Sequence, residues 1–457
     1  MIDTSHLLND EQMQHFLSKG YLPLKSSLPA EFHQKIYDRT TEVMERDGNP
    51  GNNILPQVPE IQKVFSDPIV QGAVSSVVGP AYTMHSHRHC HINSPNSDGG
   101  GWHKDSYWGY RKIRPHRCRW AMIFYYPQDT PFEQGPTGVI GGTHVLEKRV
   151  PDESQEDQTP VCGEAGTMAL VHFDLWHRAY PNQTDKMRYM MKFQFTRMAE
   201  PEGPAWNGGQ GSWPGDGANA NIGSALWDWN RGVRPPQQDL DNSIEQLAQG
   251  LRHEAESQRL NAAYTLGRGG QAALAPLLEA LRHDTDETCL AAAYGLGLLN
   301  ETAAAALIDA TQDAAARVRA HAAFALGDMG AAAADAGVEA LALLVNDPDE
   351  TVRRVIPEAL GTILQHPQTA VPALIRLLQD EDAQTRYEAA YGLARFGNAS
   401  AAAVPALEAA LADENRYVRN HSAEALKAIG TAAAVKALMD YLAVVRWCPM
   451  THKQSTF

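Results

Sequence analysis

Two stretches, Gly101-Trp102-His103-Lys104-Asp105 and His177-Arg178-Ala179-Tyr180-Pro181-Asn182, carry most of the information in this chain. On a β-strand, residues i and i+2 point to the same side, so His103 and Asp105 can bind one metal ion while Lys104 points away. We predict that His177 is the third ligand and arrives from a distant strand. Two histidines and one carboxylate leave three octahedral positions open, which is typical of mononuclear non-haem iron(II) sites.

Arg188 follows His177 by 11 residues. Across a short turn, a residue at this distance can return beside the metal. A guanidinium there would hold a dicarboxylate through a bidentate, charge-assisted pair, a role that lysine fills less well.

The His-x-Asp pair, the distal histidine before Pro181-Asn182, and the downstream arginine resemble the motifs of the phytanoyl-CoA dioxygenase family. The likeness covers roughly residues 5–200 and includes Gly135 to His144, which resembles a turn of that family. It implies Fe(II), 2-oxoglutarate and O2 as cofactor and co-substrates. It also implies that His103, Asp105 and His177 are the catalytic metal ligands. Arg188 would bind the far carboxylate of 2-oxoglutarate, whose oxidation to succinate and CO2 drives hydrogen abstraction from the substrate.

Two positions depart from the family pattern. Members often have serine two residues after the distal histidine, where this chain has Ala179, so another donor must help to bind the co-substrate. Some members use a basic residue where this chain has Ser94. The carboxylate that related halogenases lose is present as Asp105, which favours hydroxylation.

The resemblance implies a double-stranded β-helix, of the jelly-roll or cupin-like kind, as the catalytic domain over residues 1–200. The sequence itself predicts N-terminal helices at about residues 9–20 and 29–46, with a strand at 21–24 between them. Further short strands are expected between residues 82 and 197, which suggests a sandwich or barrel. The predicted strands include 119–126, 167–173 and 189–195.

Residues 201–243 are expected to form a linker rich in Gly, Pro and Trp, with no regular element up to residue 236. Its four tryptophans can pack on the first domain; they are Trp206, Trp213, Trp227 and Trp229.

After the linker, residues 244–445 repeat a pattern about six times, which makes the second domain an all-α solenoid of helix pairs. The pattern resembles HEAT-like repeats of the type also seen in phycobilisome lyases. Each repeat has a leucine, and these are Leu266, Leu296, Leu326, Leu360, Leu393 and Leu426. Seven residues earlier stands Arg259, Cys289, Arg319, Arg353, Arg386 or Arg419. An acidic residue precedes it, namely Glu254, Asp284, Asp313, Asp347, Asp380 or Asp413. We expect the acidic residue to cap the second helix and the arginine to pair with an adjacent cap.

Other polar groups have a structural and a functional interpretation. His172-Phe173-Asp174 is a rival His-x-Asp pair, which we interpret as structural. His85, His87, His89 and His91 alternate on one strand, so they form either a second metal site or a polar strand beside the iron pocket. Tyr107 and Trp108 follow the ligand pair and either line the substrate pocket or pack in the core.

Five basic residues lie between Arg111 and Arg119, together with His116. A solvated loop is the favoured interpretation, and a funnel for an anionic substrate is the alternative.

The amino-acid composition limits the kinds of binding partner and cellular location that we expect for this protein. The net charge of −15 argues against a nucleic acid. No apolar run approaches the roughly 20 residues of a membrane helix, and the polar N-terminal residues show no signal peptide. Scattered cysteines without a Cys-x-x-Cys pair indicate a reducing, cytoplasmic location. They are Cys90, Cys118, Cys162, Cys289 and Cys448.

The leading hypothesis is a 2-oxoglutarate-dependent dioxygenase that hydroxylates an unactivated C–H bond of a small or carrier-bound substrate. The repeats would bind a protein partner or mediate self-assembly. The alternative is a non-catalytic scaffold protein with a vestigial oxygenase barrel. A third hypothesis, lyase chemistry in the repeats, ranks last because the helical half has no reactive Cys or His cluster. The substrate is not encoded in any motif that we identify.

Overall fold

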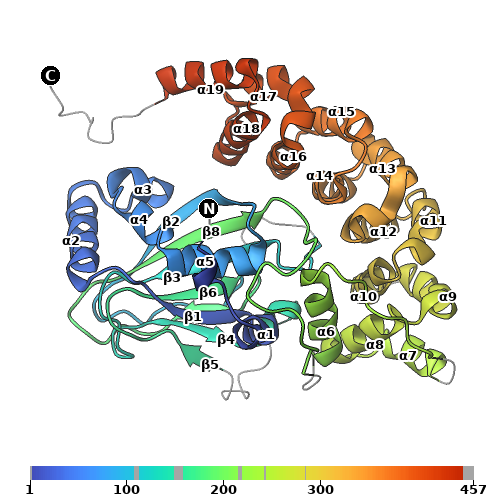
Figure 1. The fold of residues 1–457 in the computed structure, drawn as a ribbon, viewed down its shortest axis with the longest axis horizontal. Coiled ribbons are helices and arrows are strands. Elements are labelled where there is room, and N and C mark those ends of the chain that lie inside the picture. The colour runs from blue at the N-terminus through green and yellow to red at the C-terminus, as the bar shows by residue number, and fades with distance from the viewer. Residues whose placement is uncertain are drawn as a thin grey trace. The chain divides into compact units, whose positions relative to one another are not determined.

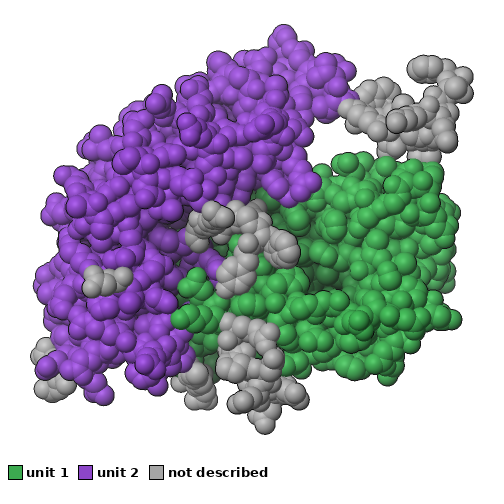
Figure 2. Space-filling view, turned by 180° about the vertical axis from the view of Figure 1, so that it is seen from behind, with its two compact units in different colours: residues 1–109, 116–234 green, residues 110–115, 235–457 purple. Residues whose placement is uncertain are grey.

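The structure is a computed structural model that describes residues 3–107, 113–148, 158–214, 219–240, 243–283 and 285–445. The chain divides into two compact units (Figure 2). Unit 1 comprises residues 1–109 and 116–234, and unit 2 comprises residues 110–115 and 235–457. Within the described residues, no helix combines the length and the apolar character needed to cross a bilayer. The domain limits at residues 200 and 243 stay predictions.

The N-terminal elements follow the sequence signals. Helix α1 (Asp10–Lys19) begins at a capping box, because the side chains of Asn9 and Gln12 each accept the backbone N–H of the other. It ends at Gly20, whose φ of 76° is the left-handed conformation. Strand β1 (Tyr21–Lys25) and helix α2 (Ala30–Asp47) follow. The predictions for this region are confirmed.

The described part of unit 1 contains two antiparallel sheets (Figure 1). The larger has the order β1-β6-β3-β8-β2, and the smaller has the order β5-β4-β7. Together they are the layers of the predicted jelly roll, and the fold-class prediction is confirmed. The strands are β2 (Tyr82–Asn93), β3 (Trp120–Tyr125), β4 (Thr137–Ile140), β5 (Gln158–Pro160), β6 (Thr167–His172), β7 (His177–Ala179) and β8 (Arg188–Arg197).

One face of the larger sheet packs on helices. Phe193 of β8 stacks on Phe65 with ring centroids 4.1 Å apart, and Tyr189 contacts Tyr37 of α2 at 5.2 Å. Side chains alternate along a strand, so Arg188 and the other even-numbered residues of β8 point to the opposite face. The short helices of this region are η1 (Thr4–His6), η2 (Gly51–Asn53), α3 (Ile54–Gln57), α4 (Ile61–Phe65), α5 (Pro68–Val78), η3 (Asp105–Tyr107) and η4 (Thr143–Val145).

The segment after the sheets is more regular than predicted. The expectation of no regular element was wrong, because helix α6 spans Ala220–Asn230. Its apolar residues Ile222, Leu226 and Trp229 have helical spacing, a pattern obscured by the glycines and prolines around it. Packing of tryptophans on unit 1 is confirmed for two of them. Trp206 donates to Asp10 at 2.7 Å, and the Trp229 ring lies 4.8 Å from the Arg197 guanidinium.

The described part of unit 2 contains α7 (Ile244–Gly250) and then six helix pairs, as predicted (Figure 1). All six repeat leucines have an exposed fraction of 0%, so each is a core contact between stacked helices. The pairs are α8 (Glu256–Leu266) with α9 (Gly270–Leu281), α10 (Asp286–Leu298) with α11 (Glu301–Ala310), α12 (Ala316–Asp328) with α13 (Ala334–Leu343), α14 (Glu350–Ile363) with α15 (Pro367–Leu377), α16 (Ala383–Phe396) with α17 (Val404–Ala410), and α18 (Arg416–Ile429) with α19 (Ala432–Val444).

Arginine–aspartate pairs join successive repeats. Arg353 donates through Nε to Asp380 at 2.7 Å, and its Nη1 donates to the carbonyl of Asp347. The same arrangement links Arg319 to Asp347 and Arg386 to Asp413. The predicted pairing of arginine with an adjacent acidic residue is confirmed for these repeats.

The predicted role of the aspartate itself was wrong. It does not cap the second helix of its repeat. Asp380 lies in the turn before the next first helix, where it accepts the N–H of Asp382. Asp382 is the residue that caps α16, by accepting the N–H of Thr385. The spacing between the acidic residue and the repeat arginine did not show which of these neighbouring positions caps the helix. Asp284, the acidic residue of the second repeat, lies outside the described residues.

Substitution Arg353→Ala tests how much the arginine–aspartate pairs between repeats contribute to stability. Asp380 is mostly buried, with 7% of its side chain exposed, and would lose a charge-assisted partner. We expect the free energy of unfolding to fall by about 1–2 kcal/mol, measured by urea denaturation followed by circular dichroism. The control Lys436→Ala removes an exposed pair with Asp440 and should change stability little. Equal effects of the two substitutions would contradict a structural role for the arginine–aspartate pairs between repeats.

Candidate metal centre

A backbone bridge brings the two predicted histidine ligands together. His177 begins β7, which pairs with β4, and His103 pairs with it as an isolated antiparallel bridge. The N–H of each histidine donates to the carbonyl of the other at 3.0 Å. Residues paired in this way lie directly opposite and share a face. The two imidazole centroids are 4.3 Å apart.

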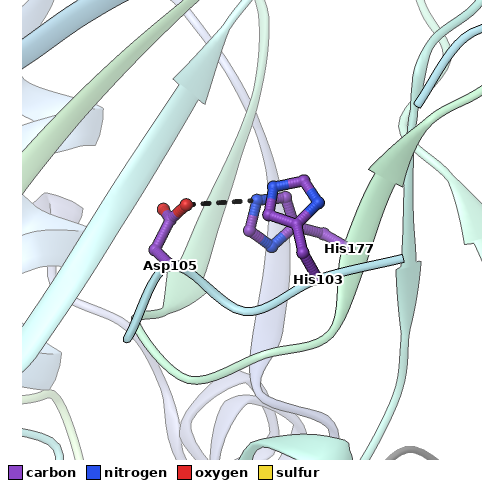
Figure 3. A group of neighbouring side chains, drawn as sticks. All are labelled: His103, Asp105 and His177. Atoms are coloured by element: carbon purple, nitrogen blue, oxygen red, sulfur yellow. Dashed lines mark ion pairs between the residues drawn. The ribbon is translucent and has the colours of Figure 1, made fainter. Parts of the chain in front are cut away.

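Asp105 completes the group from an unexpected backbone conformation. It was predicted on a strand with His103, but it begins the 3-10 turn η3, so that prediction was wrong. The turn still directs the carboxylate towards the histidines. Asp105 Oδ1 lies 3.7 Å from His177 Nε2, and one ligand atom from each of the three residues lies within 4.8 Å of the others (Figure 3). In the described part of the chain, this is the only such group of His, Cys, Asp or Glu.

Neighbouring carbonyl groups orient both imidazoles. His103 Nδ1 lies 2.9 Å from the carbonyl oxygen of Gly101, and His177 Nδ1 lies 3.0 Å from that of Leu175. A carbonyl only accepts, so each Nδ1 carries the proton and each Nε2 presents a lone pair. Histidine ligands of metal ions are held in this way. Lys104 points away as predicted, because its ammonium donates to the carbonyls of Thr143 and Leu146.

The protonation states suit metal binding. Burial lowers the pKa of His177 to about 4, although the Asp105 charge opposes the shift. Burial alone would raise the pKa of Asp105, but the charge and the hydrogen bonds of Lys192 outweigh it and hold that pKa below its usual range. At neutral pH, therefore, a neutral imidazole faces an ionised carboxylate.

Lys192 is a site residue that the sequence analysis missed. It lies on β8, is 2% exposed, and its Nζ lies 2.8 Å and 2.7 Å from the two oxygens of Asp105. A signal was available, because Lys192 lies in the predicted strand 189–195 and follows Arg188 by four residues, an even interval that puts both on one face of an extended chain. A lysine inside an apolar strand is itself unusual.

Arg188 lies on this face of β8 and is 1% exposed. Its Nε donates to the carbonyl of Gly135 at 3.0 Å, and its guanidinium carbon lies 5.9 Å from the Tyr126 ring centre. Gly135 also lies close to other segments, because a Cβ there would lie 2.3 Å from the Asn93 amide nitrogen. Burial lowers the pKa of Arg188. Among the described residues, no carboxylate forms an ion pair with Arg188, so its buried charge has no counter-ion from that part of the chain.

The family model for phytanoyl-CoA dioxygenases matches residues 16–190, and the HEAT-repeat model matches residues 304–383, 338–404 and 371–446. Residues 16–190 form a phytanoyl-CoA dioxygenase domain. The predicted family resemblance is confirmed: this chain combines a non-haem oxygenase domain with HEAT repeats.

The oxygenase domain is also similar to solved structures, each at a low TM-score. The carbocyclase SnoK from nogalamycin biosynthesis is 17% identical, with 44% of this chain and 88% of that chain covered and a TM-score of 0.35. HygX from Streptomyces hygroscopicus, with nickel and 2-oxoglutarate bound, is 16% identical, with 42% and 87% covered and a TM-score of 0.34. EctD from S. alaskensis, with 2-oxoglutarate and 5-hydroxyectoine, is 17% identical, with 42% and 77% covered and a TM-score of 0.36. No match to a curated protein was found.

The histidine-rich strand of the oxygenase domain is β2. Its register against β8 shifts between Met84 and Arg88. The rings of His87, His89 and His91 follow one another at 6.3 Å and 4.7 Å, whereas His85 packs on Trp120 at 4.8 Å. Among the residues described, these histidines do not form a metal-binding group of three. Burial is the main cause of the low pKa of His91. The charges of Lys192, Asp105 and His177 also affect this pKa, so His91 lies within electrostatic reach of the predicted metal ligands.

The rival pair, His172 and Asp174, lies in another buried cluster of the oxygenase domain. Asp174 N–H donates to His172 Nδ1 at 3.1 Å, and the His172 ring lies 5.0 Å from that of His144. These contacts agree with the structural interpretation. Trp108 and the side chain of Tyr107 lie outside the described residues, so their predicted place in the substrate pocket stays a prediction.

The favoured interpretation of residues 111–119 as a solvated loop was wrong at its C-terminal end. Arg119 is 8% exposed and pairs through Nε and Nη2 with Glu200 at 2.9 Å and 3.0 Å. His116 is also buried. The carbonyl of Arg114, in unit 2, accepts a hydrogen bond from Tyr294 at 2.7 Å. Arg111 and Lys112 lie outside the described residues.

The buried histidines predict an acid-sensitive oxygenase domain. Burial, and then the charge of Lys104, lowers the pKa of His172 to about 3. Because this imidazole gains a proton on unfolding at any pH between about 6.5 and 3, the free energy of unfolding should fall as the pH falls through that window. His172→Asn keeps an acceptor for the Asp174 N–H and removes the titration.

We therefore expect the loss of stability between pH 6.5 and 5 to be smaller in His172→Asn than in the unsubstituted protein, by about 1–2 kcal/mol. Urea unfolding of the metal-free protein, followed by tryptophan fluorescence, measures it. The exposed His6→Asn variant is the control for histidine number. An unchanged pH dependence in His172→Asn would show that the imidazole is not held neutral.

Proposed function

We propose that the oxygenase domain is an Fe(II)- and 2-oxoglutarate-dependent hydroxylase. The observation that carries the proposal is the convergence, within 4.8 Å, of one ligand atom from each of two imidazoles and one from an ionised carboxylate. One carboxylate and two imidazoles, without thiolates, are a donor set that suits Fe(II). His103, Asp105 and His177 would hold the metal on one face and leave the opposite face for the co-substrate.

The surroundings of Arg188 fit a dianionic co-substrate. A buried guanidinium without a carboxylate partner is costly, and an anionic ligand would offset that cost. Arg188 would bind the far carboxylate of 2-oxoglutarate through its two terminal nitrogens, while Gly135 holds Nε and so fixes the plane of the guanidinium.

His91 is a candidate for the donor that Ala179 does not supply. Its Nε2 is buried and has no hydrogen-bond partner among the described residues. Burial, and next the Lys192 charge, holds the pKa of His91 well below its ordinary value. A neutral imidazole with its proton on Nε2 can donate one hydrogen bond to a carboxylate oxygen of the co-substrate.

When bound, Fe(II) and 2-oxoglutarate supply an oxidant from O2, with release of succinate and CO2, that can hydroxylate a C–H bond. The residues of this chain position the reactants and limit water. Phe124 lies against His177 at 5.3 Å between ring centroids, and both are buried. We further propose a small or carrier-bound substrate, and a protein partner for the HEAT repeats. A reducing cytoplasm is the compartment that suits Fe(II).

One observation favours the alternative, a scaffold with a vestigial barrel. The ion pair with Lys192 satisfies Asp105 without a metal ion. Arg188 has no such compensation, because no carboxylate of the described residues pairs with its charge, and this favours the enzyme.

Substitution of the three ligands tests the proposed metal site. His103→Ala, Asp105→Ala and His177→Ala should each abolish stoichiometric Mn(II) binding in calorimetry and succinate formation from 2-oxoglutarate with Fe(II), because each removes one of only three protein donors. His172→Asn, a buried histidine outside the group, is the matched control and should retain both. Binding that survives all three substitutions would place the metal elsewhere.

Arg188→Met tests the co-substrate site. Loss of a buried bidentate partner should raise the Kd for 2-oxoglutarate about 100-fold, measured on the Mn(II)-loaded protein. Mn(II) affinity in the absence of 2-oxoglutarate should stay close to that of the unsubstituted protein. A 2-oxoglutarate affinity that does not change would remove Arg188 from the site.

A further inference from the structure

Lys192 lies beside the proposed metal site, although it is not needed as a metal ligand. β8 lies between β3 and β2 in the larger sheet, and Lys192 is paired with Phe124 on one side and His89 on the other. Its side chain is 3% exposed, and it bonds both oxygens of Asp105. A buried ammonium is stable only with a counter-charge, and Asp105 is the carboxylate that provides it.

The two oxygens of Asp105 are not equivalent. Oδ1 lies 3.7 Å from His177 Nε2, on the side where the histidines converge. Lys192 Nζ bonds both oxygens, at 2.8 Å to Oδ1 and 2.7 Å to Oδ2, so the contact with His177 is what distinguishes them. A cation placed among the three ligand side chains can bind Oδ1 while Oδ2 remains hydrogen-bonded to Lys192.

We propose that Lys192 is a positioning residue that holds Asp105 as a one-oxygen ligand and keeps the adjacent coordination position open for the co-substrate. This inference rests on the proposed function. A carboxylate with both oxygens free can bind a metal ion in a bidentate way and occupy two positions. With Oδ2 held by Lys192, three protein atoms bind the metal and three positions remain.

The charge of Lys192 acts in the same sense. It neutralises Asp105, so a divalent cation in the site keeps nearly its full double charge. Repulsion by the ammonium weakens metal binding, and the additional positive charge strengthens the binding of a dianion such as 2-oxoglutarate. Removing Lys192 should therefore change the two affinities in opposite directions. A lysine that only stabilised the fold would lower both when replaced.

Lys192→Met is the test, with Lys192→Arg as the variant that keeps the charge and the donor. Calorimetry with Mn(II), and then with 2-oxoglutarate on the Mn(II)-loaded protein, gives both affinities for the full chain. We expect Lys192→Met to bind Mn(II) about tenfold more tightly and 2-oxoglutarate about tenfold more weakly. Lys192→Arg keeps a charge-assisted pair with Asp105 and should stay within about threefold of the unsubstituted protein for both.

The number of water molecules on bound Mn(II), measured by water proton relaxation without 2-oxoglutarate, shows whether Lys192 positions Asp105 or acts only through its charge. The unsubstituted protein should hold about three, and Lys192→Met about two, because a bidentate Asp105 displaces one.

Weaker Mn(II) binding by Lys192→Met, unchanged 2-oxoglutarate affinity, or an unchanged water count would each overturn the inference while leaving the proposed function intact. Failure of the unsubstituted protein to bind Mn(II) would overturn the proposed metal site as well. Thermal unfolding of each variant shows whether the fold is retained.

Discussion

The site depends on the two backbone hydrogen bonds between His103 and His177. They join segments that are distant in the sequence and fix the two histidines as a directly opposed pair. Once the pair is formed, the Gly101 and Leu175 carbonyls orient the rings. The turn that begins at Asp105 then needs only to direct one oxygen to a prepared face. A metal ion binding here would find its nitrogen ligands already arranged by the smaller sheet, which lowers the conformational entropy cost of binding.

Strand β8 supplies the electrostatic half of the site. Its odd-numbered residues pack on helices, as Phe193 does on Phe65, and this contact fixes the direction of the even-numbered ones. Two buried cations, Arg188 and Lys192, therefore project from one face of a single rigid strand. Lys192 has its counter-charge in Asp105, whereas Arg188 has none within the described parts of the chain. This imbalance distinguishes the centre from a structural ion-pair network, in which each charge has a partner.

The sequence was sufficient where local signals decide the outcome. The capping box at Asn9, the repeat leucines of unit 2 and the residue types of the metal group were all available from spacing. The sequence was insufficient where contacts between distant residues determine the conformation or burial of a side chain. Asp105 leaves the strand direction in a turn that the His-x-Asp pattern does not specify. Arg119 is buried because Glu200, 81 residues away, returns to pair with it. The role of Lys192 becomes visible only when β8 is placed against the turn that carries Asp105.

The central claim is that His103, Asp105 and His177 bind a single Fe(II) ion. Anomalous diffraction at the iron edge, from crystals grown anaerobically with Fe(II) and 2-oxoglutarate, tests it most directly. The account predicts one iron peak at about 2.0–2.2 Å from the Nε2 atoms of both histidines and from Oδ1 of Asp105. An iron peak at another cluster, such as the one around His144 and His172, or crystals with 2-oxoglutarate bound and no iron at the three residues, would contradict it.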